Sequence, residues 1–420
     1  MSREQLQIVL PGLMTGLVGL VVLVWWLTVR PPVDIDKRVP GMAGTPQILG
    51  DTESVRIGEH FTAFATEPGG GFEGSWPRFR GGGFDNIRGD GVALADEWEG
   101  GGPQVLSSIA AGDGHAGPAV HKGRVYLLDY EEESGSDMLR CLSLADGSEL
   151  WRRWYQVRVP RNHGMSRTIP AVTDDYVVTI GPKCHVMCVD AVSGDLRWGI
   201  DLVQDYGTEV PMWYTGQCPM IEDGVAVLAP GGDDVLLAGI DCETGDRVWE
   251  TPNPDGFGMS HSSIMPATIG GRRMYIYCAI GGMVGVSAEG GDRGQILWKT
   301  TAWDRSVIAP SPVALDDGRI LLTAGYGGGG MLIQVTAEDG EFSVEVLQEY
   351  KSSEGLASEQ QTPLLYEDRF LAVLPKDAGA LRNQFVCVSP DDCTEILWAS
   401  GKTKRFGLGP YLAADGKFFV

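Results

Sequence analysis

A tryptophan recurs at nearly constant spacing along the chain, and this spacing constrains the fold more than any other feature. Trp151, Trp198, Trp249 and Trp298 are separated by 47, 51 and 49 residues, and Trp398 follows 100 residues later. Three of these residues end closely similar stretches, "CLSLADGSELW", "CVDAVSGDLRW" and "GIDCETGDRVW". Repetition with a period near fifty residues predicts a series of equal structural units, each packed against its neighbours.

Each unit contains four short apolar segments separated by turn residues. The first segment of nearly every unit begins beside a proline, as in "GPAV" at 117, "IPAV" at 169, "CPMI" at 218, "MPAT" at 265, "SPVA" at 311, "TPLL" at 362 and "GPYL" at 409. No segment shows the 3.6-residue period of a helix. Four strands in about fifty residues are typical of a β-propeller blade. The sequence therefore predicts an all-β propeller of about seven to eight four-stranded blades over residues 76–420.

The turn before each tryptophan explains the repeated motif. An Asp-Gly, Ser-Gly or Thr-Gly pair supplies a tight turn, because glycine adopts positive φ without strain. The tryptophan then lies on the fourth strand, where burial against the neighbouring blade is worth about 2–3 kcal/mol. We expect equivalent positions between blades for Trp151, Trp198, Trp249, Trp298 and Trp398, with Val346 near this position in the unit that lacks the tryptophan.

The last unit is the shortest. Six nearly complete units lie between Gly117 and Trp398, whereas the seventh begins at Gly409 and reaches Val420 within its second strand. We expect this blade to be incomplete in the chain, with an unpaired edge near "KFFV" that would promote aggregation unless it is covered.

The N-terminal region differs from the repeats. After a short tail, residues 1–5, the 24 residues of 6–29 carry no charge, and as a helix they would span roughly 36 Å. We interpret 6–29 as an uncleaved transmembrane anchor, the alternative being a removed signal peptide, and 30–75 as an extended linker. Arg30, Lys37 and Arg38 follow the anchor, and by the positive-inside rule they favour a cytoplasmic propeller.

Charge and cysteine content narrow the classes of partner. The formal net charge is −23, so the surface repels phosphate backbones and nucleic acid is not an expected partner. None of the eight cysteines is in a CxxC pair, which argues against zinc-binding and thioredoxin-like motifs. Most are expected to be small apolar residues on buried strands. Local bridges Cys184–Cys188 and Cys387–Cys393 are the alternative.

The repeat resembles a known family. "GIDCETGDRVW" and "CVDAVSGDLRW" are similar to the tryptophan-docking repeat of the propellers related to pyrroloquinoline-quinone (PQQ) enzymes. "SWPRFRGGGFDNI", Ser75–Ile87, resembles an opening motif of many bacterial members. The family includes quinoprotein alcohol dehydrogenases and outer-membrane assembly propellers of the BamB type. The resemblance implies a periplasmic propeller, and it implies that "GPQVLSSIA", with Ser107 near the tryptophan position, supplies the outer strand of the last blade.

The loops that lead into the first strand of each unit, here called the leading loops, crowd around one mouth of a propeller. Six polar or aromatic residues fall on these loops: His115, His163, Arg167, Trp213, His261 and Arg305. Polar and aromatic groups that converge on a concavity are typical of a ligand site. Such residues also simply fill and hydrate the mouth in many propellers, and this alternative stays open. If the histidines keep ordinary pKa values, an anionic ligand would bind more tightly below about pH 6.5.

Two functions of different classes follow. The first is a non-catalytic, membrane-anchored propeller that binds an envelope protein or a small anionic or aromatic ligand. The second is a PQQ-dependent oxidoreductase acting on alcohols or sugars. The resemblance implies that such an enzyme holds its quinone between a tryptophan and a disulfide of adjacent cysteines, with a calcium site beside it. No two cysteines are adjacent here, and no leading loop carries an obvious calcium-ligand set, so we expect neither a cofactor nor a metal.

Overall fold

The computed structural model describes residues 14, 16–25, 55–65, 67–70, 74–89, 91–98, 102–162 and 164–420. The chain divides into a unit that ends at Asp51 and a unit from Thr52 to Val420. In the first unit, a helical stretch with exposed side chains covers residues 16–25. The rest of the predicted anchor, except residue 14, lies outside the described residues, as do linker residues 30–54. Within the described part of the chain, no helix combines the length and apolarity needed to span a bilayer.

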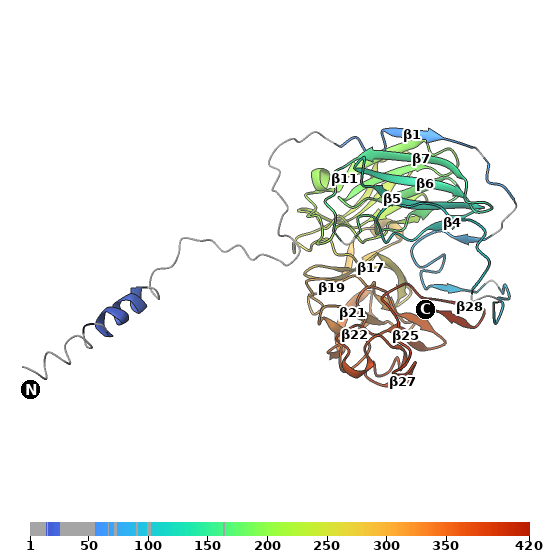
Figure 1. The fold of residues 1–420 in the computed structure, drawn as a ribbon. Coiled ribbons are helices and arrows are strands. Elements are labelled where there is room, and N and C mark those ends of the chain that lie inside the picture. Colours follow the sequence, from blue (N-terminus) through green and yellow to red (C-terminus); the bar gives the residue numbers. More distant parts are fainter. Residues whose placement is uncertain are drawn as a thin grey trace, which may run out of the picture. The chain divides into compact units, whose positions relative to one another are not determined.

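The second unit contains seven β-sheets that follow one another along the chain (Figure 1). Five sheets have four strands each, and in all five the strands pair antiparallel in chain order. The second sheet contains β8 (Ala171–Val172), β9 (Tyr176–Ile180), β10 (His185–Asp190) and β11 (Leu196–Asp201), and the third contains β12 (Met220–Glu222), β13 (Val225–Leu228), β14 (Val235–Asp241) and β15 (Arg247–Pro252). The fourth sheet contains β16 (Met265–Ile269), β17 (Arg272–Ala279), β18 (Gly282–Ser287) and β19 (Ile296–Thr300), and the fifth contains β20 (Val313–Ala314), β21 (Arg319–Ala324), β22 (Gly329–Glu338) and β23 (Glu341–Tyr350). The sixth sheet contains β24 (Leu364–Tyr366), β25 (Arg369–Val373), β26 (Phe385–Val388) and β27 (Ile396–Ala399).

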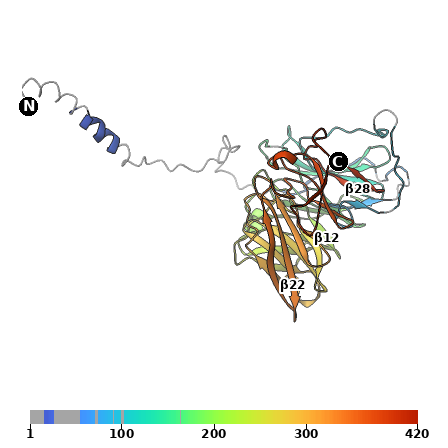
Figure 2. The same cartoon turned by 90° about the horizontal axis from the view of Figure 1, so that it is seen from below.

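The first and last sheets differ from this pattern. The first has the order β1 (His60–Ala63), β7 (Glu149–Gln156), β6 (Ser136–Ser143), β5 (Arg124–Glu131), β4 (Ala119–His121) and β2 (Ser75–Trp76). The seventh has only β29 (Lys417–Phe419), β28 (Leu412–Ala414) and β3 (Ile87–Arg88). Short helices are α2 (Leu202–Tyr206) and two 3₁₀ turns, Gly290–Asp292 and Gly379–Leu381. The predicted all-β architecture of four-stranded sheets is confirmed, and Figure 2 shows β22 projecting beyond the other sheets.

The tryptophan of one sheet packs on the glycine of the repeated turn in the next sheet. The ring of Trp151 lies over Gly194 in the turn of the second sheet, where an added Cβ would come within 2.7 Å of the ring. Trp198 covers Gly245 of the third sheet in the same way. Both glycines have positive φ, 75° and 78°. Glycine is therefore required twice over, by the turn and by the tryptophan of the preceding sheet.

Hydrogen bonds fix the tryptophan on this turn. Trp151 Nε1 donates to the carbonyl oxygen of Val192 at 3.0 Å, and Trp198 Nε1 donates to that of Cys242 at 3.0 Å. Trp151, Trp198, Trp249 and Trp298 are between 2% and 9% exposed. The predicted packing between neighbouring sheets is thus seen for these four tryptophans.

The expectation is wrong for Trp398. It pairs with Cys387 just before a bulge, the register that Trp198 shares with Cys188. Yet its side chain is 54% exposed. The next sheet has no third and fourth strand, so no glycine turn lies over the ring.

The position of Val346 also needs correction. Each tryptophan pairs with the residue that immediately precedes a bulge, and in the fifth sheet that residue, Leu332, pairs with Gln348. Gln348 therefore occupies the tryptophan position. Its Nε2 donates to Asp392 Oδ1 at 2.7 Å, and its Oε1 accepts from the backbone of Cys393 at 3.0 Å. Hydrogen bonds to the next turn replace the ring, and that turn lacks the glycine.

The linker prediction fails at its C-terminal end. Strand β1, within the predicted linker 30–75, pairs antiparallel with β7 and becomes an outer fifth strand of the first sheet (Figure 1). Ile57, just before it, packs against the cluster that holds Trp151. Alternation of Phe61 and Ala63 with polar neighbours is the strand signal in this stretch. The packed domain thus begins before residue 76.

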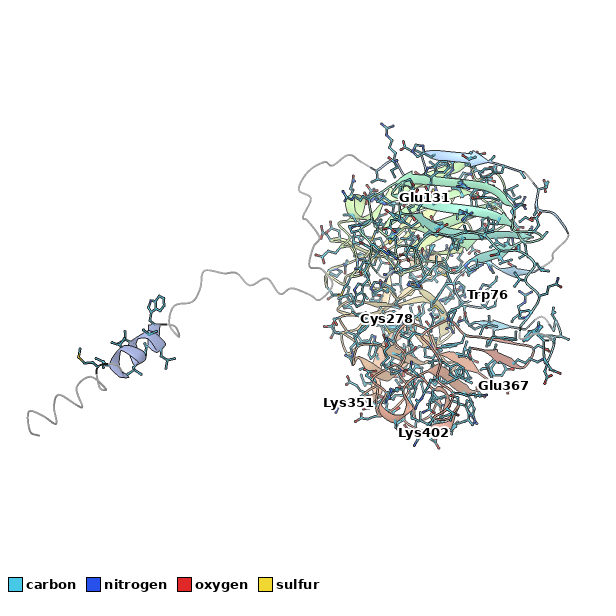
Figure 3. All side chains as sticks on the ribbon, viewed as in Figure 1. Trp76, Glu131, Cys278, Lys351, Glu367 and Lys402 are labelled. Atoms are coloured by element: carbon cyan, nitrogen blue, oxygen red, sulfur yellow. The ribbon has the colours of Figure 1, made fainter. Side chains whose placement is uncertain are left out.

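Residues 74–89, which contain the opening motif Ser75–Ile87, form a strap that contacts several sheets. Strand β2 pairs antiparallel with β4 of the first sheet, and β3 pairs parallel with β28 of the seventh sheet. Between them, the carbonyl of Pro77 accepts from Val172 of the second sheet at 2.8 Å. Figure 3 shows Trp76 between the strands of the first sheet and those of the last.

Arg80 lies at the middle of this strap and is only 3% exposed. Its guanidinium donates to four carbonyl oxygens, at 2.8 to 3.1 Å: those of Phe84, Asp85, Thr362 and Pro363. Phe79 and Phe84 pack against the cluster formed by the fourth and fifth sheets. The strap therefore ties distant sheets together around one buried cation.

Candidate binding face at the leading loops

Three of the six predicted residues come together. Trp213 stacks on His261, with ring centroids 6.4 Å apart and planes at 18°. The ring of His261 is largely buried, and the charge of Arg167, a residue of a third leading loop, acts on it. Trp213 also contacts Tyr326 at 5.4 Å between centroids. Tyr326 lies in the β21–β22 turn, so four segments of the chain contribute to this cluster.

The segment 211–216 is folded tightly around His261. Trp213 and Tyr214 are consecutive residues with positive φ, 65° and 74°. Bulky residues in this region cost on the order of 1–3 kcal/mol each. A Cβ on Gly216 would come within 3.0 Å of the His261 ring, and the carbonyls of Met212 and Tyr214 lie within hydrogen-bond reach of that ring. The strained turn thus presents Met212 and Trp213 outward from a histidine that it encloses.

His261 does not support the expected pH dependence. Burial, together with the nearby charge of Arg167, lowers the pKa of His261 from 6.5 to about 4. The imidazole is therefore neutral at pH 6.5 and stays so until the pH falls near 4. The premise that His261 keeps an ordinary pKa is wrong, because the folded turn excludes water from its ring.

Two cations lie beside the rings. Arg167 Nε donates to the carbonyl of Gly164 at 3.1 Å, and burial lowers the pKa of its guanidinium. Lys183, on the turn between β9 and β10, places its Nζ 5.2 Å from the centre of the Tyr214 ring. Burial also lowers the pKa of Lys183. Among the described residues, no carboxylate forms an ion pair with Lys183.

The other predicted residues lie differently. His115 is exposed, and its ring lies against Gly164 of the neighbouring leading loop. His163 lies outside the described residues. Arg305 packs over the ring of Trp303 at 4.4 Å and donates to Glu349 Oε1 at 2.8 Å. Its charge is therefore directed toward the outer strand β23 of its own sheet.

Sequence reasoning missed Tyr326 and Lys183. The stretch "GYGGGG" is typical of a hairpin turn, and it does form one. Because five of its six residues are glycines, Tyr326 gave no separate signal of a binding role. Tyr326 has φ of 57° and is 59% exposed. A bulky aromatic at a position that favours glycine is the signal that could have identified it.

One hollow lies among the leading loops before β24 and β28, beside Tyr411, and another lies around Arg272 and Asp292 on an outer turn. The ring of Trp213 already contacts two other rings. Among the described residues, no three metal-binding side chains cluster together. The ring that a planar quinone would stack on is thus in contact with His261 and Tyr326.

A buried polar group lies between the first and second sheets. Asp137 is 1% exposed, and its Oδ2 accepts from the Tyr155 hydroxyl at 2.6 Å. Tyr155 contacts the ring of His185 edge-on at 5.4 Å. Burial raises the pKa of Asp137 from 3.8 to about 6, although the tyrosine hydrogen bond opposes the shift.

This shift predicts a pH-dependent stability. In the unfolded chain Asp137 ionises near pH 4, whereas in the folded protein it keeps its proton until about pH 6. The folded state therefore binds more protons between these values, and stability falls as pH rises, by about 3 kcal/mol. Asp137→Asn should lose this component. Urea unfolding of both proteins at pH 4.5 and pH 7 checks it, and parallel pH profiles would contradict it.

Successive, mostly four-stranded antiparallel sheets, with tryptophans docked on glycine turns, are consistent with a β-propeller. Residues 135–293 match the family model described as outer membrane protein assembly factor BamB. No curated protein matches the sequence significantly.

Solved structures resemble the chain at low sequence identity. BamB from Moraxella catarrhalis is 14% identical, with 61% of this chain and 65% of that chain covered and a TM-score of 0.40. A europium-containing methanol dehydrogenase is 10% identical, with coverages of 72% and 74% and a TM-score of 0.48. The quinohemoprotein alcohol dehydrogenase ADHIIG from Pseudomonas putida HK5 is 12% identical, with coverages of 73% and 61% and a TM-score of 0.44. The chain thus spans somewhat less than two thirds of the BamB and ADHIIG chains.

Proposed function

We propose that the protein is a non-catalytic propeller that binds a partner protein of the cell envelope through its leading-loop mouth. The observation that carries this proposal is the exposed cluster formed by Met212, Trp213 and Tyr326. Met212 is 37% exposed and Tyr326 is 59% exposed, and they flank the half-buried Trp213. Methionine and aromatic residues are enriched at the centre of protein interfaces.

The charges beside the cluster indicate the chemistry of the partner. Arg167 and Lys183 place two cations next to the rings in a protein with a net charge of −23. A partner segment with an acidic side chain beside an aromatic or aliphatic one would match this local pattern. A small anionic or aromatic ligand would use the same groups, but the contacts of Trp213 with His261 and Tyr326 favour a surface contact over insertion between the rings.

The strained turn supports a binding role. Two consecutive bulky residues with positive φ, Trp213 and Tyr214, directly follow the exposed Met212. Strained backbone conformations cluster at functional sites, because at other sites a residue with a lower conformational energy could occupy the same position. The turn holds Trp213 in one orientation before any partner arrives, which reduces the ordering cost of binding.

The alternative function, a PQQ-dependent oxidoreductase, gains no support from the arrangement at the mouth. A planar cofactor requires an open aromatic face, and Trp213 contacts His261 and Tyr326. The proposal therefore assigns the rings to a protein contact.

We also propose the wider setting of this propeller. Residues 6–29 would anchor the chain in a membrane, with the propeller on the periplasmic side. The propeller would have about seven to eight blades in all. Resistance of the full chain to carbonate extraction from membranes tests the anchor.

Replacing both Trp213 and Tyr326 by alanine should reduce capture of the partner at least tenfold, because aromatic anchors typically contribute 2 kcal/mol or more each. The measurement is the amount of each envelope protein retained from a detergent extract by immobilised propeller. Arg305→Ala is the matched control, since Arg305 binds Glu349 and should leave capture unchanged. Equal capture by the double variant and the wild type, both with native circular dichroism, would refute this binding face.

A further inference from the structure

Two buried cysteines meet between the second and third sheets. Cys188 lies on β10, the third strand of its sheet, and Cys242 lies in the turn that follows β14. The Cys188 thiol donates to the carbonyl oxygen of Cys242 at 3.4 Å, so the two cysteines are in direct contact. Both side chains are fully buried, at 0% exposure.

The pair arises from the repeat. Cys188 faces Trp198 across its sheet as Cys141 faces Trp151 one unit earlier. The turn residue that corresponds to Cys242 in the earlier unit is Ala191, which accepts a hydrogen bond from Tyr126. Only the junction between the second and third sheets therefore brings two thiols together at this repeat position among the described residues.

The two local bridges considered from sequence, Cys184–Cys188 and Cys387–Cys393, are not formed in this structure. All eight cysteines are free thiols in this structure. Cys184 contacts Thr215 and Met259, at 3.1 and 3.9 Å, rather than Cys188. Cys393 donates its backbone N–H to Gln348, and Cys387 lies on the neighbouring strand β26. Sequence spacing offered local bridges only as the alternative to buried thiols, whereas folding places Cys188 beside a residue 54 positions later.

We propose that Cys188 and Cys242 form a disulfide that joins the second and third sheets when the chain folds in the presence of a disulfide oxidant of the glutathione class. One thiolate attacks the oxidant and forms a mixed disulfide, releasing one thiol. The second thiolate then displaces the remaining oxidant thiol and closes the Cys188–Cys242 bond. The two cysteines lose two protons and two electrons, and the oxidant is reduced to two thiols.

Burial sets the time at which the bond forms. Contact with Cys242, together with burial, raises the pKa of the Cys188 thiol, so the folded protein holds little of the reactive thiolate. An oxidant also has no access to groups that are fully buried. The bridge therefore closes during folding, before the two sheets pack, and the folded reduced protein resists oxidation.

The test is refolding of the denatured, reduced protein in a glutathione redox buffer, followed by trypsin digestion and mass spectrometry. The expected product joins peptide 184–197 to peptide 198–247, and the denatured protein titrates six free thiols instead of eight. The oxidised protein should melt about 5 °C above the same protein after reduction, because the bridge closes a loop of 54 residues.

Variants separate this pairing from its neighbours, since each peptide carries a second cysteine. Cys184→Ala and Cys218→Ala should keep the linked peptides and the difference in melting temperature. Cys188→Ala and Cys242→Ala should lose both, whatever a cavity does to their absolute stability. Eight free thiols after oxidative refolding, or a linkage that survives Cys188→Ala, would overturn the proposal.

Discussion

Replacing Arg80 by alanine is expected to lower the free energy of unfolding by about 3–5 kcal/mol, the largest effect of any single polar substitution considered for this chain. The guanidinium donates to four carbonyl oxygens, two in its own strap and two just before β24. Hydrogen bonds from a charged donor are worth about 1.5–3 kcal/mol each, and their buried acceptors would be left unsatisfied. Urea unfolding followed by circular dichroism measures the loss.

Arg78→Ala is the matched control for this prediction. Arg78 lies two residues away on the same strap, but it makes one long hydrogen bond, 3.4 Å, to the carbonyl of Ile221. Its guanidinium also lies 5.1 Å from the centre of the Phe84 ring. We expect its loss to cost about 1 kcal/mol. If Arg78→Ala and Arg80→Ala destabilise the protein equally, the strap does not depend on the buried cation.

The second large effect concerns the docked tryptophans. Trp151→Ala should cost about 3–5 kcal/mol, because it leaves a cavity over Gly194 and the Val192 carbonyl without its donor. Trp398→Ala should cost less than about 1 kcal/mol, because 54% of that side chain is already exposed. The two residues share one register in their sheets, so the difference isolates the contribution of the neighbouring turn. Equal unfolding free energies for the two variants would contradict the docking account.

Spacing and turn chemistry predicted most of the fold because the repeat acts locally. The turn at Asp241 shows how: its Oδ1 accepts from the backbone N–H groups of Glu243 and Thr244, and Gly245 follows with positive φ. All of these contacts lie within five residues, so the motif is readable in the sequence. The same reasoning failed at Gln348, because β22 and β23 are ten residues long each and are joined without the repeated turn motif from which the position is counted.

The candidate site was only partly predictable, for a different reason. Leading-loop positions identified Arg167, Trp213 and His261, since the repeat fixes where those loops begin. Tyr326 comes from the turn between the second and third strands, and its approach to Trp213 depends on how neighbouring sheets pack. Arg305 was placed on the correct loop, but its partner Glu349 lies 44 residues away and turns the charge outward.

Long-range contacts also decided the role of the strap. The motif "WPRFRGG" marks its sequence, but nothing local shows that Arg80 reaches Thr362 and Pro363, 282 and 283 residues later. Gly81 does have a local explanation, since a Cβ there would lie 3.1 Å from the ring of Trp76. Sequence thus identified the segment, and packing determined what it holds together.

The central claim, that Met212, Trp213 and Tyr326 form the partner-binding face, is tested most directly by site-specific photo-crosslinking in cells. A photoreactive amino acid would replace Met212 in one strain and Val346 in another, because Val346 is similarly exposed, at 43%, on the outer strand β23. The account predicts a discrete protein adduct from position 212 that disappears with Trp213→Ala and Tyr326→Ala, and no such adduct from position 346. A discrete adduct from position 346 with none from position 212 would contradict it.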